Sequence, residues 1–254
     1  LRECGYDGVE IPVTGQSASE LQKMASACDE LGLERTASAL VGAEVNPISP
    51  DPAVRDAALA NLKQSIDGAN LIGADILIGG IYQAHKYFTG AAATDEEWQW
   101  SADYLHAGGE YAQGMGVRLG LEFLNRFEVF LINTSADCKR MVEQVGLTNV
   151  GVHYDTHHAN IEDPAPSEAI ANIRGVINHV HLSASHRGTL GTGQVDWDST
   201  FASLREIDYS GWLVIEAFGT SDPELASAAN VWRNAFASRE EVYGEGIRFI
   251  RDRL

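Results

Sequence analysis

Four polar residues lie where apolar runs of strand character end, and all four are of types that bind divalent metal ions. They are Glu122 after Val117–Leu121, Asp155 after Val150–Tyr154, His181 after Ile177–Val180, and Glu216 after Trp212–Ile215. Three carboxylates and one imidazole form a hard, oxygen-rich set that suits Mn²⁺, Mg²⁺ or Co²⁺, whereas zinc is less favoured without a cysteine ligand. A single such glutamate is more often a salt-bridge partner, but four in succession favour a metal site.

The histidines are concentrated in the same half of the chain. Six of the eight lie between His153 and His186. His179 and His181 are two positions apart on a predicted strand, so their side chains share one face, and we expect one ligand and one packed neighbour. For three histidines we expect an ordinary surface or structural role, namely His85, His106 and His153.

These candidate ligands must be positioned by the predicted elements, which alternate between strands and helices. The apolar runs predict strands at Val9–Pro12, Glu34–Leu40, Asp75–Ile81, Val117–Phe123, Val150–Tyr154, Val176–Leu182 and Trp212–Ala217. Helical periodicity and capping signals predict helices at Ala18–Leu31, Ala53–Ile72, Glu96–Met115, Ser135–Val145, Ser167–Arg174, Asp198–Ile207 and Arg239–Leu254.

Such alternation predicts an α/β fold with a parallel sheet, specifically a single (β/α)8 TIM-barrel domain over residues 1–254. Seven strands are visible, and we expect the natural protein to have a first strand before Leu1 that is missing here. The competing architecture is an open, doubly wound sheet, but the GxGxxG turn that would favour it is not found. In a parallel barrel, all four strand-end residues would meet at the carboxyl-terminal rim.

Composition excludes several classes of function. The net charge is −18, from 36 acidic and 18 basic residues, which disfavours nucleic acid as a partner. The hydrophobic content of 44% is ordinary for a globular protein, and the sequence has neither an apolar run long enough to span a membrane nor a visible signal peptide. The three cysteines lack metal-type spacing, which predicts free thiols in a reducing cytoplasm.

Several segments together resemble the D-tagatose 3-epimerase / D-psicose 3-epimerase family of xylose isomerase-like barrels. They are Leu121–Glu128 (LEFLNRFE), Tyr154–Glu162 (YDTHHANIE), His179–His181 with Arg187, and Ile215–Phe218 (IEAF). The resemblance implies one divalent metal ion, most readily Mn²⁺ with Mg²⁺ or Co²⁺ as alternatives, and a homodimer or homotetramer. It assigns metal binding to Glu122, Asp155, His181 and Glu216, acid/base catalysis to Glu122 and Glu216, and contacts with the O1/O2 end of a ketose to Glu128, His158 and Arg187.

Two loops depart from the family pattern. Ala184 stands where the family has an acidic residue after the ligand histidine, and the segment Ile81–Phe88 also differs. Both loops are expected to line the pocket, so they bear on which sugar is bound.

The implied reaction is epimerisation of a keto-sugar at C3, in which a proton leaves one face of the carbon and another returns to the opposite face. An aldose–ketose isomerase or a dehydratase on the same scaffold is the alternative. An endonuclease-IV-like protein would need further histidines, yet Glu34–Leu40 has none, and Asp196-Trp-Asp198 replaces its Asp-x-His motif. A sugar-binding protein without catalysis would not need two carboxylates opposed at a metal.

Overall fold

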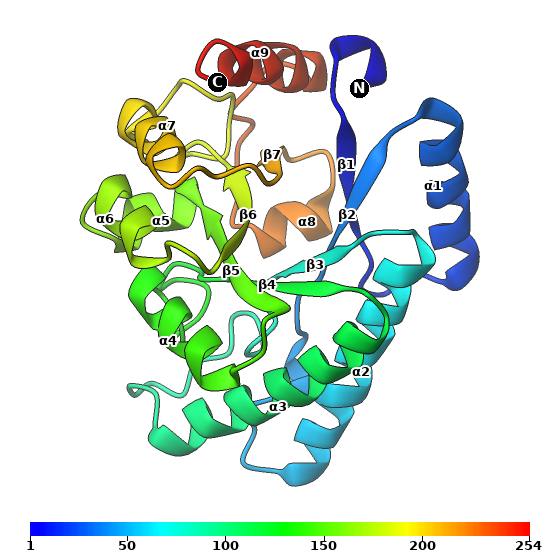
Figure 1. Cartoon of the computed structure of the whole chain (residues 1–254), viewed down its shortest axis with the longest axis vertical. Coiled ribbons are helices and arrows are strands. Elements are labelled where there is room, and N and C mark those ends of the chain that lie inside the picture. The colour runs from blue at the N-terminus through cyan, green and yellow to red at the C-terminus, as the bar shows by residue number, and fades with distance from the viewer.

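The computed structural model describes residues 1–254 and shows a parallel barrel surrounded by helices (Figure 1). All seven strands are parallel and follow one another in the order β1 to β7. The strands are β1 (Gly8–Pro12), β2 (Glu34–Ser38), β3 (Ile76–Gly79), β4 (Arg118–Glu122), β5 (Val150–Asp155), β6 (Ile177–Leu182) and β7 (Leu213–Ile215). The predicted TIM-barrel fold is therefore confirmed.

The helices lie between the strands along the chain. They are α1 (Ala18–Leu31), α2 (Pro52–Leu71), α3 (Asp95–Gly114), α4 (Ser135–Val145), α5 (Thr156–Glu162), α6 (Pro166–Asn172), α7 (Trp197–Glu206), α8 (Pro223–Ala228) and α9 (Arg239–Arg251), with short 3-10 turns η1 (Arg2–Cys4) and η2 (Ala43–Val45). Most of them form the outer layer, whereas α8 lies over the sheet in the middle of Figure 1. No helix is long and apolar enough to cross a membrane.

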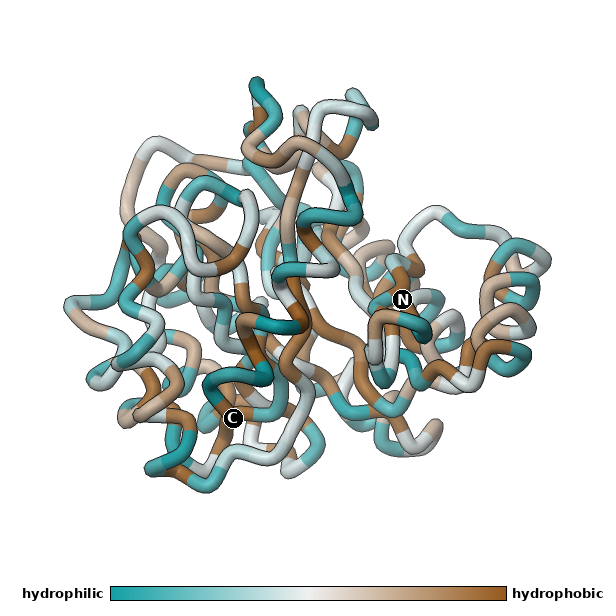
Figure 2. The backbone as a smooth tube through the Cα atoms, turned by 90° about the horizontal axis from the view of Figure 1, so that it is seen from above, coloured by the Kyte–Doolittle hydropathy of each residue, from teal (hydrophilic) through white to brown (hydrophobic).

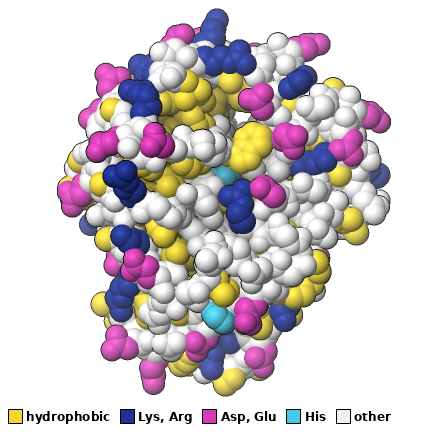
Figure 3. Space-filling view, viewed as in Figure 1, with side chains coloured by type: hydrophobic (Ala, Val, Ile, Leu, Met, Phe, Trp, Pro, Cys, Tyr) yellow, Lys and Arg dark blue, Asp and Glu magenta, His cyan; other side chains and the backbone are white.

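The hydrophobic core lies on both faces of the strands. Ile76, Leu77 and Ile78 of β3 are all fully buried, as expected for a parallel strand covered by helices outside and by side chains within the barrel. The outer helices alternate between hydrophobic and hydrophilic residues along their length, so each has a buried and a solvated face (Figure 2). Acidic side chains are scattered over the visible surface with basic ones between them (Figure 3), in keeping with a role in solubility.

Capping residues explain why several predicted helix bounds agree with the structure. Ser17 and Glu20 form a capping box at the start of α1, and Gly32 ends that helix in the left-handed conformation. A second capping box, from Thr94 and Glu97, begins α3. Such signals are local, so they can be recognised without knowledge of the tertiary structure.

The predicted and observed bounds differ most where a strand pairs on one side only or a helix is short. β7 spans only Leu213–Ile215 rather than Trp212–Ala217, because it pairs only with β6 and lies at the edge of the sheet. Helices α5 and α8 were not predicted, since they have only seven and six residues and show little periodicity. Asp155 begins α5, where its side chain accepts a hydrogen bond from the backbone N–H of His157 at 2.6 Å. The cysteines are free, as predicted.

Candidate active site at the carboxyl ends of the strands

The four residues predicted to bind a metal converge at one rim of the barrel. They are the last residue of β4 (Glu122), the last of β5 (Asp155), the penultimate of β6 (His181) and the first after β7 (Glu216). Each offers one carboxylate oxygen or imidazole nitrogen, and these atoms all lie within 4.8 Å of one another. The parallel register causes this convergence; for example, Asp155 and His181 are direct partners across β5 and β6.

This group of side chains fits a divalent cation. Nδ1 of His181 is buried without a hydrogen-bond partner and lies 3.5 Å from Oε1 of Glu216 and 4.0 Å from Oδ2 of Asp155. An unpaired buried nitrogen is unfavourable, and so is the repulsion among three neighbouring carboxylates. A hard cation bound between them would relieve both, since oxygen and imidazole ligands suit Mn²⁺, Mg²⁺ or Co²⁺.

Arg187 supplies the positive charge beside this group. Its guanidinium Nη1 pairs with a carboxylate oxygen of Glu216 and lies 3.2 Å from Oδ2 of Asp155. The same nitrogen donates to Oγ of Ser183 at 3.0 Å, and the side chain is buried. Arg187 has a positive φ of 63°, so a strained turn after β6 directs it back to the rim.

Two further predicted residues, Glu128 and His158, lie against the same site and are held by Asn125. Asn125 Nδ2 donates to Oε1 of Glu128 at 2.8 Å, and its backbone N–H donates to Nδ1 of His158 at 3.0 Å. Because burial and the charge of Arg187 hold the pKa of His158 well below its usual value, the ring is neutral. Its Nε2 lies 3.1 Å from Nη2 of Arg187, which can only donate, and 3.6 Å from Oε1 of Glu122.

The two candidate acid/base residues have different electrostatic environments. Burial raises the pKa of Glu122 well above its usual value, and the charge of Glu216 raises it further. Burial also acts to raise the pKa of Glu216, but the charges of Arg187 and His181 outweigh it and lower the pKa to about 2. Environments that separate the pKa values of two carboxyl groups are typical of an acid and a base that work as a pair.

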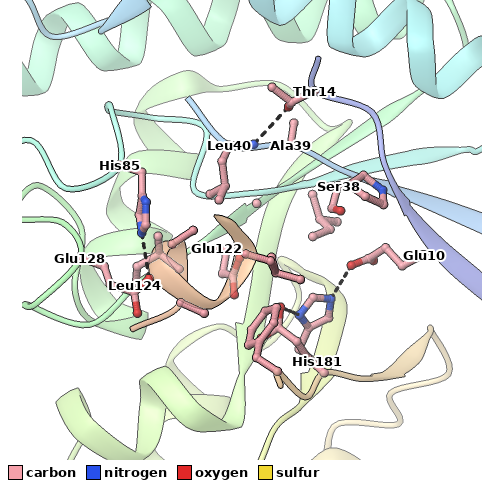
Figure 4. A pocket seen from close by; sticks show the side chains of 18 of the residues that line it. Glu10, Thr14, Ser38, Ala39, Leu40, His85, Glu122, Leu124, Glu128 and His181 are labelled. Atoms are coloured by element: carbon pink, nitrogen blue, oxygen red, sulfur yellow. Dashed lines mark hydrogen bonds and ion pairs between the residues drawn. The ribbon is translucent and has the colours of Figure 1, made fainter. Parts of the chain in front are cut away.

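A cavity of about 380 Å³ opens onto these residues (Figure 4). One end is polar and contains three of the four candidate ligands, Glu122, His181 and Glu216, together with Glu128, His158 and Arg187. The other end is mainly apolar and is closed in part by α8, through Leu225 and Ala228. Its remaining hydrophobic lining comes from Ala39, Leu40, Ile78, Leu124, Phe218 and Ala229. The volume suits a small molecule with one polar end anchored at the rim.

Two residues of the site are not predicted from the sequence. His85 is expected there to have an ordinary surface or structural role, and Glu10 is not among the candidates. His85 lies in the cavity wall, with Nε2 3.1 Å from Oε2 of Glu128. Glu10 of β1 lies 2.8 Å from Nε2 of His181 (Figure 4). The available signal for Glu10 was a carboxylate in the middle of a predicted strand, whereas the four candidate ligands were identified at the ends of apolar runs.

Other polar candidates lie beside the site or away from it. His153 is fully buried, and its Nδ1 lies 3.7 Å from Oε2 of Glu122. His106 is half-exposed, and its Nδ1 lies 2.8 Å from the carbonyl oxygen of Val145. Asp196 is the N-cap of α7 and accepts a hydrogen bond from the backbone N–H of Ser199 at 3.0 Å. Its position therefore gives no support to an endonuclease-like metal site.

Comparison with known proteins gives matches over nearly the whole chain. A family model described as xylose isomerase-like TIM barrel matches residues 1–253. The chain is 34% identical over 255 residues to a ketose 3-epimerase from Arthrobacter globiformis, covering 100% of this chain and 88% of that relative. It is 31% identical to an L-ribulose 3-epimerase from Methylomonas sp., covering 98% and 87% of the two chains. A crystal structure of D-allulose 3-epimerase from Methylomonas sp. in complex with D-allulose matches with a TM-score of 0.94 and 30% identity, covering 99% of this chain and 88% of that one.

Proposed function

The chain belongs to the xylose isomerase-like TIM barrel family and is an isomerase, and from that premise we propose that it is a divalent-metal-dependent 3-epimerase of free keto-sugars. The observation that carries the proposal is the convergence of Glu122 and Glu216 with Asp155 and His181 at one rim. Relatives named ketose 3-epimerase and L-ribulose 3-epimerase support the substrate class.

We assign metal binding to Glu122, Asp155, His181 and Glu216. A divalent ion bound there, with Mn²⁺ as the first candidate, supplies electrostatic stabilisation of the negative charge that develops on the sugar oxygens. Two buried carboxylates, the partly exposed carboxylate of Glu216 and the unpaired Nδ1 of His181 form a donor set suited to such an ion.

The proton transfers fall to the two glutamates. Glu122 belongs to β4 and Glu216 follows β7, so two strands separate them and their carboxylates approach the bound sugar from different sides. One removes the C3 proton, and the electron pair of the broken C–H bond moves toward the C2 carbonyl. The other returns a proton to the opposite face of C3, which restores the carbonyl with inverted configuration.

Glu128, His158 and Arg187 hold the carbonyl end of the ketose. Arg187 is a permanent donor and can donate a hydrogen bond to O1 or O2. His158, whose Nε2 lies 3.1 Å from Nη2 of Arg187, orients that guanidinium beside the sugar, while Glu128 accepts a hydrogen bond from a hydroxyl. Arg187 is the only lysine or arginine that lines the cavity, and Asp155 and Glu216 already neutralise it. The cavity therefore offers no free cation for a phosphate, which favours an unphosphorylated sugar.

The test is isotope exchange during turnover in heavy water with a panel of free ketoses and Mn²⁺. The proposal predicts C3-epimeric products that carry deuterium at C3. An aldose–ketose isomerase would instead move the carbonyl group between C1 and C2, and a dehydratase would release water. Product without C3 deuterium, or a product of either other class, contradicts the proposal. The homo-oligomeric state stays a prediction, which light scattering can check.

A further inference from the structure

A carboxylate from the first strand contacts the candidate histidine ligand. Oε1 of Glu10 lies 2.8 Å from Nε2 of His181, and 171 positions separate the two residues in the chain. Glu10 belongs to β1 and His181 to β6, which are not neighbours in the sheet. The contact therefore crosses the interior of the barrel rather than following a pair of adjacent strands (Figure 4).

The two ring nitrogens of His181 have different surroundings. Nε2 faces Glu10, whereas Nδ1 faces Glu216 and Asp155 at 3.5 and 4.0 Å and has no hydrogen-bond partner. An ionised carboxylate can only accept hydrogen bonds, so it favours the ring form with its proton on Nε2. In that form the lone pair is on Nδ1 and points toward the carboxylates.

Glu10 is itself held in place. The hydroxyl of Thr36, its register partner on β2, donates to Oε2 at 2.9 Å, and Nε2 of His179 lies 3.0 Å from the same oxygen. Both oxygens of Glu10 are thus engaged with neighbours, and Glu10 is not a member of the four-residue donor group. This position suits Glu10 to orient the metal-binding side chain of His181 rather than to bind the metal itself.

We propose that Glu10 is a positioning residue that fixes the Nε2–H tautomer and the ring orientation of His181, so that Nδ1 is presented to a divalent cation. The inference rests on the metal site of the proposed function. A carboxylate that orients a metal-binding histidine in this way raises the basicity of the ligand, and its loss lowers metal affinity by about 10–100-fold.

The experiment measures Mn²⁺ binding by calorimetry on the full chain with Glu10→Gln. The amide keeps the shape but lacks the charge and can donate toward Nε2, so we expect the dissociation constant for Mn²⁺ to rise about 10–100-fold. Thr36→Val is the matched control, because it removes one hydrogen bond to Glu10 but leaves the contact between Glu10 and His181. Thr36→Val should keep most of the affinity for Mn²⁺.

A second measurement reports the tautomer directly. Histidine ¹⁵N NMR of the metal-free protein, at a pH where the ring of His181 is neutral, should show its proton on Nε2, and Glu10→Gln should show a mixture of ring forms. If Glu10→Gln does not fold, Glu10→Asp replaces it, and the shorter side chain should give a smaller loss of affinity in the same direction.

The result that overturns the inference is a folded Glu10 variant with unchanged Mn²⁺ affinity and an unchanged His181 tautomer. Equal losses in the Glu10 and Thr36 variants would also overturn it, because they would indicate a general packing effect. Asp155→Asn separates this inference from the metal site itself. Normal Mn²⁺ affinity in Asp155→Asn would contradict the proposed metal site. If Asp155→Asn loses Mn²⁺ affinity while Glu10→Gln binds Mn²⁺ normally, only the role of Glu10 is contradicted.

Discussion

Nε2 of His85 lies 3.1 Å from Oε2 of Glu128, and this pair forms part of the wall of the candidate active-site cavity. The other oxygen of Glu128 accepts a hydrogen bond from Asn125. Burial acts to raise the pKa of Glu128, but the hydrogen bond with His85 and the charge of Arg187 outweigh it and lower the pKa. Glu128 is therefore an ionised acceptor of fixed orientation, suited to bind a sugar hydroxyl.

Replacing His85 should weaken sugar binding more than it slows the chemical step. His85→Phe removes one of the two partners that orient Glu128, and we expect KM to rise about tenfold with kcat within about threefold of the unchanged protein, because a hydrogen bond to a charged group contributes ~1.5–3 kcal/mol. Steady-state kinetics on the best ketose will measure this. His106→Gln, at a half-exposed position on α3, is the control. An unchanged KM in His85→Phe would show that His85 does not support Glu128.

The two glutamates should each be required for epimerisation. Glu122→Gln and Glu216→Gln keep an oxygen at the site but remove the basic group, so turnover should fall by about 10²–10⁴-fold in each. One variant should still exchange the C3 proton of a single epimer with heavy water, because the remaining carboxylate can act on its own face. Glu143→Gln on the exposed side of α4 is the control. Normal turnover in Glu216→Gln would rule out the two-base mechanism.

Removal of divalent metal should abolish activity. Excess chelator should reduce turnover to background, and Mn²⁺ or Co²⁺ should restore it best, since the three carboxylates and the unpaired Nδ1 of His181 need a cation to complete the site. Asp155→Asn removes one of the three carboxylates and should raise the metal concentration needed for half-maximal activity. Full activity in chelator would show that the reaction does not depend on a metal.

Arg187 should matter more for the sugar than for the metal. Arg187→Ala removes a donor near the carbonyl end of the ketose, so kcat/KM should fall by about 10²-fold or more. Metal affinity should not fall in parallel, because Asp155 and Glu216 lose the cation that now neutralises them. Arg187→Lys should recover little, since an ammonium cannot contact the carboxylates and Ser183 with one planar group. Calorimetry with Mn²⁺ and kinetics separate the two effects.

The loop that follows β4 should depend on a buried tyrosine. The hydroxyl of Tyr82 donates to the carbonyl of Ile132 at 3.0 Å and accepts from the backbone N–H of Leu124 at 3.2 Å. Tyr82→Phe leaves both backbone groups unpaired, so the free energy of unfolding should fall by ~1–3 kcal/mol. Urea denaturation will measure the loss, and Tyr104→Phe, a buried tyrosine of α3, is the control. Equal stability losses in both variants would contradict this reasoning.

The sequence by itself determined the alternation of strands and helices, and with it the barrel. Helix α1 could be placed residue by residue because Ser17, Glu20 and Gly32 act on their immediate neighbours. The strand-end residues Glu122 and Asp155 could be recognised because each directly follows an apolar run. In a parallel sheet, the ends of successive strands meet at one rim, so the convergence of the four candidate ligands followed from local patterns and topology alone.

Only the tertiary structure decided which neighbours support those residues. Glu10 and His181 are 171 positions apart, and His85 and Glu128 are 43 positions apart, so no local pattern connects the members of either pair. Their contacts depend on how the barrel brings β1 toward β6 and how the loop after β3 folds over the rim. The reason is one of range: caps and hydrophobic periodicity act within a few residues, whereas a hydrogen bond across the barrel depends on the packing of the whole sheet.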